Sequence, residues 1–162
     1  IWIRCQQDNR YMDSIRKRVY LDVCALCRPF DDQRQARIRL ETTGVELILS
    51  HVRMNRLELI VAPTHDIEIE ATTDLEERSQ LLFLLNQLGS RPVFDLWAGQ
   101  QRAKRLIAQG MGIADAAHVA FAEQSQAEFI TVDDRLLRMC RRGNILVWCG
   151  TPLAYCDKEG LE

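Results

Sequence analysis

The chain has 162 residues, the size of one ordinary domain that can bury its own hydrophobic core. Hydrophobic residues make up 47% and charged residues 27%, which excludes a disordered chain. No apolar run approaches the roughly eighteen residues of a membrane span, and a formal net charge of -2 excludes a global attraction to nucleic acid. We therefore expect a soluble, cytoplasmic protein with no membrane partner, in which any phosphate binding comes from local patches.

The chain opens with a segment that resembles no targeting signal. Residues 1–18 have neither an initiator Met nor the basic, apolar, small-residue order of a secretion signal, and we interpret them as an N-terminal extension or an expression remnant. Residues 19–23 are β-branched and aromatic and predict a first buried strand. After a loop that contains Pro29, apolar residues recur at helical spacing from 33 to about 53. We expect one long helix there, with Gly44 as a point where it could bend.

The next third of the chain repeats the order of strand and helix. Residues 57–62 predict a second strand that ends before Pro63, and Thr64 or Asp66 can cap a short helix that runs to Glu70. Asp74 opens a further helix, which Gly89 ends.

The remaining segments complete an α/β pattern. In chain order we expect a loop or short strand at 92–96, helices at 97–109 and 115–124, a strand at 128–132, a basic helix at 133–142 and a last strand at 144–148. Strands separated by helices imply right-handed crossovers and a parallel sheet covered on both faces. We expect one domain over residues 19–155, followed by a tail at 156–162.

Six cysteines could suggest a disulfide framework, but a chain of this size without an export signal does not need one. We expect free thiols. Cys24 and Cys27 form a C-x-x-C, which in a thioredoxin-like setting would be redox active. Here it directly follows a strand and has no second cysteine pair or histidine cluster to complete a zinc site. We interpret the two as small, half-buried residues.

Four acidic residues stand at positions where a parallel sheet gathers its functional groups. Asp22 and Asp133 follow predicted strands, Glu68 lies on the helix after the second strand, and Asp115 begins the alanine-rich helix. Ligand sites in open parallel sheets lie outside the carboxyl ends of the strands. The four acids are therefore candidates for one site, although a strand-end role for Asp22 and a helix-capping role for Asp115 are the alternatives.

Neighbouring acids leave some of these assignments open. The Thr131-x-Asp133 pattern selects Asp133 over Asp134, and we expect Asp134 to cap the basic helix. Asp66 or Glu70 would replace Glu68 if the helix register differs. His118, three residues after Asp115, could hydrogen bond to it or be a packed helix histidine.

Clustered carboxylates repel one another strongly unless protons or cations neutralise them, so such a cluster favours a divalent metal. Ligands that are all oxygen indicate Mg²⁺ or Mn²⁺ rather than zinc, and the chain has only three histidines. Two such ions about 4 Å apart can activate water for in-line attack on phosphorus and stabilise the leaving oxygen. This chemistry is that of a nuclease.

The same segments resemble a known family. Residues 19–32 (VYLDVCALCRPFDD) look like the opening strand and loop of PIN-domain proteins, a family that includes VapC-like toxins and PIN endoribonucleases. Residues 112–122 (GIADAAHVAFA) and 129–136 (FITVDDRL) are similar to the family's paired acids, and 65–69 (HDIEI) match its intermediate acid at Glu68. The similarity covers about residues 19–155.

This resemblance implies a three-layer α/β/α sandwich with a parallel, PIN-like central sheet. It also implies a Mg²⁺- or Mn²⁺-dependent hydrolase that cleaves single-stranded RNA. Asp22, Asp115, Asp133 and Glu68 would be its metal-binding and catalytic residues, with Thr131 in the surrounding shell. Many members are toxins held by an antitoxin, and dimers are common; Ala103, Leu106, Ile107, Leu84 and Leu88 are candidates for a dimer face, or for the monomer's core.

Arginines near these acids are candidates for binding the RNA backbone. Arg135, Arg138 and Arg142 share one face of the basic helix close to Asp133. A solvated basic face is the alternative for these three. Arg28, in the loop after the first strand, is a weaker candidate, and so are Lys104 and Arg105 on the helix before Asp115.

Two other functions compete with the nuclease. PIN proteins often carry Asn, Ser or Thr shortly after the first Asp, whereas this chain has Val23 and Cys24 there. A catalytically degenerate PIN module that binds RNA or a protein partner is therefore the main alternative. A receiver-like phosphoacceptor domain ranks last, because its paired acids, lone acceptor Asp and late Lys do not occur in the required order.

Overall fold

The computed structural model describes residues 15–162. Most of the expected N-terminal extension, with Trp2 and Cys5, therefore lies outside the described residues. The described part is built on a five-stranded parallel sheet in the order β3-β2-β1-β4-β5. Its strands are β1 (Lys17–Leu21), β2 (Leu57–Ile60), β3 (Gly89–Ser90), β4 (Glu128–Ile130) and β5 (Cys149–Gly150).

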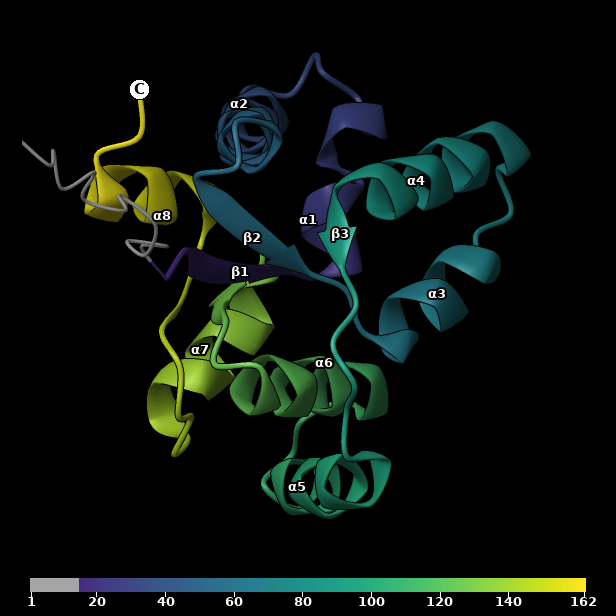
Figure 1. Ribbon diagram of the computed structural model, residues 1–162, viewed down its shortest axis with the longest axis vertical. Coiled ribbons are helices and arrows are strands. Elements are labelled where there is room, and N and C mark those ends of the chain that lie inside the picture. The colour runs from purple at the N-terminus through teal and green to yellow at the C-terminus, as the bar shows by residue number, and fades with distance from the viewer. Residues whose placement is uncertain (1–14) are drawn as a thin grey trace, which may run out of the picture.

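Helices cover both faces of this sheet, which confirms the predicted α/β/α sandwich. They are α1 (Val23–Leu26), the 3-10 turn η1 (Arg28–Phe30), α2 (Ala36–Arg53), α3 (Pro63–Glu70), α4 (Leu75–Leu88), α5 (Leu96–Ala108), α6 (Ile113–Gln124), α7 (Asp134–Arg142) and α8 (Pro152–Glu159). Figure 1 shows α2, α4 and α8 on one side of the sheet and α6 and α7 on the other. Helix α5 lies beyond α6, away from the sheet.

The three central strands are buried on both faces toward their carboxyl ends, because the residues there are apolar, as parallel strands require. Val19 and Leu21 of β1 point into the core under α2, α4 and α8. Tyr20, between them, points into the second core, which α6 and α7 cover. This alternation places the hydroxyl of Tyr20 on the side of the sheet that carries α6.

The order in which strands are added to the sheet reverses at β1, between β1 and β4. The first three strands run outward from β1 on one side, and β4 and β5 are added on the other. The amide of Asp22 donates to the carbonyl of Ile130 at 3.0 Å, so the ends of β1 and β4 are held side by side. In open parallel sheets the crevice at such a switch point is where ligands bind.

Two element boundaries differ from the prediction for local reasons. Helix α3 begins at Pro63 with Ala62 as its N-cap, not Thr64 or Asp66, because proline suits the first helical position. The edge strand at 144–148 is not formed; β5 is Cys149–Gly150. The apolar residues that predicted it, Ile145 and Val147, pack on the second core from an irregular segment.

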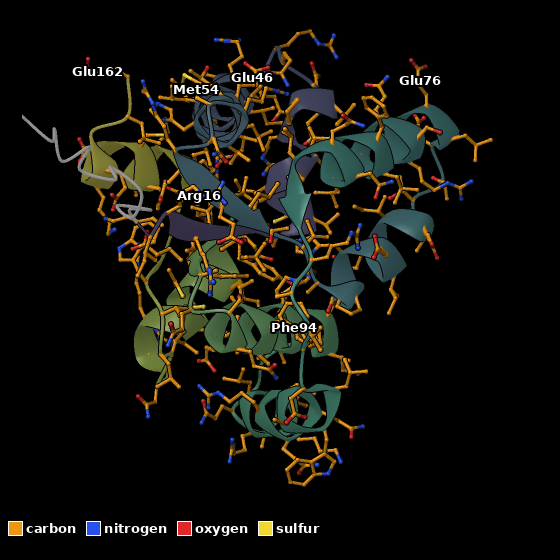
Figure 2. The ribbon with its side chains drawn as sticks, viewed as in Figure 1. Arg16, Glu46, Met54, Glu76, Phe94 and Glu162 are labelled. Atoms are coloured by element: carbon orange, nitrogen blue, oxygen red, sulfur yellow. The ribbon has the colours of Figure 1, made fainter. Side chains whose placement is uncertain are left out.

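The segment between β3 and α5 also differs. The short strand expected within 92–96 lies earlier, at Gly89–Ser90. Phe94, labelled in Figure 2, instead packs against Phe121 of α6, with ring centroids 4.7 Å apart. This contact fixes the crossover from β3 to α5 on the α6 side.

Helix α8 occupies the region where we expected a tail after residue 155. It continues to Glu159 and buries Tyr155 and Cys156 against the core under α2. Gly44, in the middle of an unbroken α2, allows this contact, because a Cβ there would lie 2.9 Å from Cβ of Pro152. Among the described helices none is long and apolar enough to span a membrane. Cys24, Cys27, Cys140, Cys149 and Cys156 are free, as predicted.

Candidate active site

Asp22 lies at the end of β1, at the switch point of the sheet. It is 4% exposed and is the N-cap of α1. One carboxylate oxygen, Oδ1, accepts hydrogen bonds from the amide of Ala25 at 2.9 Å and from Sγ of Cys24 at 3.0 Å. Burial raises the pKa of Asp22, while hydrogen bonds from Cys24, Thr131 and Ala25 act in the opposite direction. A buried carboxylate with these few donors is a strong acceptor for a cation or a proton.

Thr131 links the ends of β1 and β4. Its side chain is fully buried; Oγ1 accepts from the amide of Asp133 at 3.1 Å and lies 3.4 Å from Sγ of Cys24. The hydroxyl therefore connects the loop that follows each of the two central strands. Its expected role in orienting a ligand or water stays a prediction.

Asp133 is the N-cap of α7. Its Oδ1 accepts from the amides of Arg135 at 2.7 Å and Leu136 at 3.0 Å, which satisfies two of the open donors at this helix start. The expectation that Asp134 would cap the helix is therefore wrong. Asp134 lies in the first turn and pairs with Arg37 at 2.8 Å, directed away toward α2.

Asp115 is the third residue of α6, whose N-cap is Gly112, so it does not cap the helix. Burial and then the charge of Asp133 raise its pKa, and Glu68 adds to this, whereas His118 and Arg135 oppose it. Three predicted acids are thus close enough to feel one another's charge. Within residues 15–162 the Asp115 carboxylate accepts no hydrogen bond, so no donor of this part of the chain holds it directly.

Glu68 enters the site through a buried histidine. His118 of α6 lies with Nε2 2.9 Å from Oε2 of Glu68 and with Nδ1 2.7 Å from the hydroxyl of Tyr20. The hydrogen bond from His118 lowers the pKa of Glu68. From the sequence, Asp115 was a possible hydrogen-bond partner of His118. In the structure, the carboxylate that His118 contacts directly is that of Glu68. Asp66, considered as a substitute for Glu68, pairs with Arg91 at 2.6 Å.

A second histidine was missed by the sequence analysis. His65 is fully buried; its Nδ1 accepts from the amide of Ala62 at 3.0 Å, so Nε2 carries the proton and donates to the carbonyl of Leu21 at 2.8 Å. Burial, followed by nearby His118, lowers the pKa of His65 to about 4. This neutral ring ties the start of α3 to the end of β1, next to Asp22. Only its place two residues after Pro63 could have suggested such a role.

The donor set fits a hard divalent cation in its chemistry. Asp22, Glu68, Asp115 and Asp133 offer oxygen ligands only, which suits Mg²⁺ or Mn²⁺. Burial, and after it the charge of Asp133, raises the pKa of Asp115, so a bound cation would favour its charged form. In the arrangement seen for residues 15–162, however, no three His, Cys, Asp or Glu side chains stand close enough together to hold an ion. A bound cation would have to draw the carboxylates inward.

The candidate phosphate-binding arginines fall into two groups. Arg28 donates to Asp31 and to Glu41, each at 2.6 Å, and is therefore held by protein carboxylates. Arg135 and Arg138 project from α7 as exposed side chains. Arg135 and Arg138 remain better placed than Arg28 to bind phosphate, since Arg135 lies close enough to Asp115 to affect its pKa.

A parallel α/β/α fold with acids at its switch point places them where such sheets bind ligands. The sequence profile of the PIN domain matches residues 19–142, and the chain belongs to the PIN domain family. PIN domains are generally nucleases that use divalent metal ions. The crystal structure of FitAcB from Neisseria gonorrhoeae is similar in fold, with a TM-score of 0.51 and 14% identity over 83% of this chain and 98% of that chain. No curated protein matches the sequence.

Proposed function

We propose that this protein is a Mg²⁺- or Mn²⁺-dependent endoribonuclease that hydrolyses phosphodiester bonds of single-stranded RNA. The observation that carries the proposal is the half-buried Asp115, which has no hydrogen-bond donor among the described residues and whose pKa is raised first by burial and then by the charge of Asp133. Two acids that repel each other at the switch point of a PIN fold are costly unless they serve to bind a cation.

Each acid has a distinct role in this proposal. Asp22, Asp115 and Asp133 would hold the principal ion, and Glu68 would support a second ion or orient the attacking water. When bound, the metal lowers the pKa of water and stabilises charge on the phosphate. The backbone amides at Ala25, Arg135 and Leu136 hold Oδ1 of Asp22 and of Asp133, so binding of an ion would depend on Oδ2 of each carboxylate and on movement of the acids toward one another. Hydrolysis by water would leave a 5′-phosphate.

Partners are a further part of the proposal. Membership of the PIN family supports a toxin held by an antitoxin. A homodimer is supported by apolar side chains exposed around α5, with Trp97 71% and Ile113 78% exposed. Leu106, one of the residues expected on a dimer face, is buried in the monomer's own core instead. Leu84 and Leu88 lie on α4, across the sheet from α5.

A cleavage assay with matched acid variants tests the function. Purified protein is incubated with mixed-sequence single-stranded RNA in Mg²⁺, Mn²⁺ or EDTA. We expect metal-dependent cutting that Asp115→Asn and Asp133→Asn abolish. Asp134→Asn is the control. It removes the same charge from the residue next to Asp133, and Asp134 pairs with Arg37 instead of facing the site. Equal activity of Asp133→Asn and wild type would contradict the proposal.

A non-catalytic PIN module is the second candidate. It is favoured by the absence of a ready three-ligand cluster within the described residues and by the engagement of Glu68 with His118. This candidate predicts that folded protein binds RNA or a protein partner but cuts no RNA with either metal. Calorimetric titration with Mn²⁺ separates the two, because the nuclease must bind the ion and the degenerate module need not.

A further inference from the structure

Beside the acids, the surface is hollowed by a pocket of about 460 Å³ between the end of α5, the start of α6 and helix α7. Its walls combine the side chains of Leu106, Met111, Met139 and Ile145 with two arginines, Arg135 and Arg142. This volume lies within the range of pockets that hold small organic ligands. A cleft that combines apolar side chains with polar ones, two guanidinium groups among them, suits a ligand that is part flat ring and part anion.

The two arginines of this pocket belong to a group on α7, together with Arg138 and Arg141, that no protein carboxylate holds within the described residues. Arg18, Arg28, Arg37, Arg91 and Arg102 all pair with carboxylates. Within the described part of the chain, neither Arg135 nor Arg142 forms an ion pair. They lie seven residues apart on α7, two helical turns, and so face the same way. Their forks are therefore available to a ligand oxyanion, for which arginine is well suited.

The pocket also adjoins the candidate active site. Arg135 lines the pocket, and its amide donates to Oδ1 of Asp133 at 2.7 Å. Met111, on the other wall, immediately precedes Gly112, the N-cap of the helix that carries Asp115. A strand of RNA whose phosphate reached the acids would therefore pass the mouth of this pocket.

We propose that the pocket between α5 and α7 is a nucleotide subsite, in which Arg135 and Arg142 bind a phosphate of the RNA strand and the apolar wall receives the adjoining base. This inference rests on the proposed function for the identity of the polymer. Asn144 and the side chain of Gln109, which also line the pocket, offer donors and acceptors to the base edge. The subsite would thus contribute to the choice of cleavage sequence.

Binding measured without cleavage tests the subsite separately from catalysis. A fluorescein-labelled single-stranded RNA is titrated with protein in EDTA, and its anisotropy gives the Kd. We expect Arg142→Ala to raise the Kd about tenfold and to reduce the salt dependence by about one ion. Arg142→Lys keeps the charge but not the planar guanidinium, so its Kd should lie between those of the wild type and Arg142→Ala. Arg141→Ala is the control, since it removes the same charge from the next residue, which does not line the pocket.

A competition experiment distinguishes a nucleotide within an RNA strand from a free nucleoside monophosphate as the ligand of the pocket. Uridine, cytidine, adenosine and guanosine monophosphates are added to the same titration. We expect the strand to bind much more tightly than any of them, with Arg142 required for both. Equal Kd values for Arg142→Ala and Arg141→Ala would overturn the subsite, and so would Arg142-dependent binding of a monophosphate with no effect on RNA. Arg142-dependent RNA binding by a protein that cuts no RNA would overturn the nuclease and keep the subsite.

Discussion

Nε2 of His118 lies 2.9 Å from Oε2 of Glu68, and the imidazole is buried while the carboxylate is partly exposed. The histidine thus engages Oε2 of Glu68, and Oε1 accepts no hydrogen bond from the described residues. Outer-shell partners of this kind orient metal-binding carboxylates. His118 is in this view a positioning residue, which acts through Glu68.

We expect His118→Ala to lower metal-dependent RNA cleavage and Mn²⁺ affinity by about 10- to 100-fold. His118→Gln, which keeps a donor near Glu68, should restore part of both. The check is a double-mutant cycle with Glu68→Gln, in which the second substitution should add little to the first. Fully additive losses, or a loss of stability without a change in Mn²⁺ affinity, would show that His118 only fills the core.

The sheet and its switch point could be predicted because they follow from local patterns. Residues 19–21 are apolar, as a strand buried on two faces must be; Asp22 follows β1 directly, and Asp133 stands three residues after the end of β4. The contact of Glu68 with His118 could not be predicted. It joins residues 50 positions apart and depends on how α3 packs against α6.

Local competition between similar residues explains the errors. Asp133 and Asp134 have equal capping propensity, and only the pairing of Asp134 with Arg37 of α2 decides which one caps α7. Likewise, the apolar run at 144–148 satisfies a strand pattern, but Ile145 and Val147 use it to pack on the second core. In both cases tertiary contacts overrode a local preference.

The buried neutral His65 predicts a pH dependence of stability. Its pKa is about 4 in the folded protein and 6.5 when unperturbed, so between these values the unfolded chain binds more protons. Stability must therefore fall as the pH drops from about 6.5 to about 4, by about 3 kcal/mol in total. Denaturant unfolding at several pH values measures the slope, and His65→Asn should flatten it. An unchanged slope in that variant would assign the effect to other groups, of which His118 and Glu68 are the nearest.

Arg28 is expected to act on stability more than on RNA binding. It donates at 2.6 Å to Glu41, which is only 5% exposed, and Arg37 donates to the other oxygen at 2.7 Å. Arg28→Ala leaves a buried carboxylate with one partner, and we expect a loss of about 2 kcal/mol, or about 4–8 °C in Tm. Arg34→Ala is the control, because its pair with Asp32 is exposed and screened by solvent, so its loss should leave Tm nearly unchanged. If Arg28→Ala weakens RNA binding while stability is unchanged, Arg28 is a phosphate ligand after all.

Cys24 stands where the family resemblance led us to expect a hydroxyl or amide, and its thiol donates to Oδ1 of Asp22 at 3.0 Å. Burial and the charge of Asp22 raise the pKa of Cys24, so it stays a protonated donor. We expect Cys24→Ser to keep or raise cleavage activity, because a hydroxyl makes the same hydrogen bond more strongly. Cys24→Ala should lower it by about tenfold, since Asp22 then loses one donor. Initial cleavage rates in Mn²⁺, with Tm recorded for each variant, measure this. Equal rates for the serine and alanine variants would mean that the thiol only fills space beside Thr131.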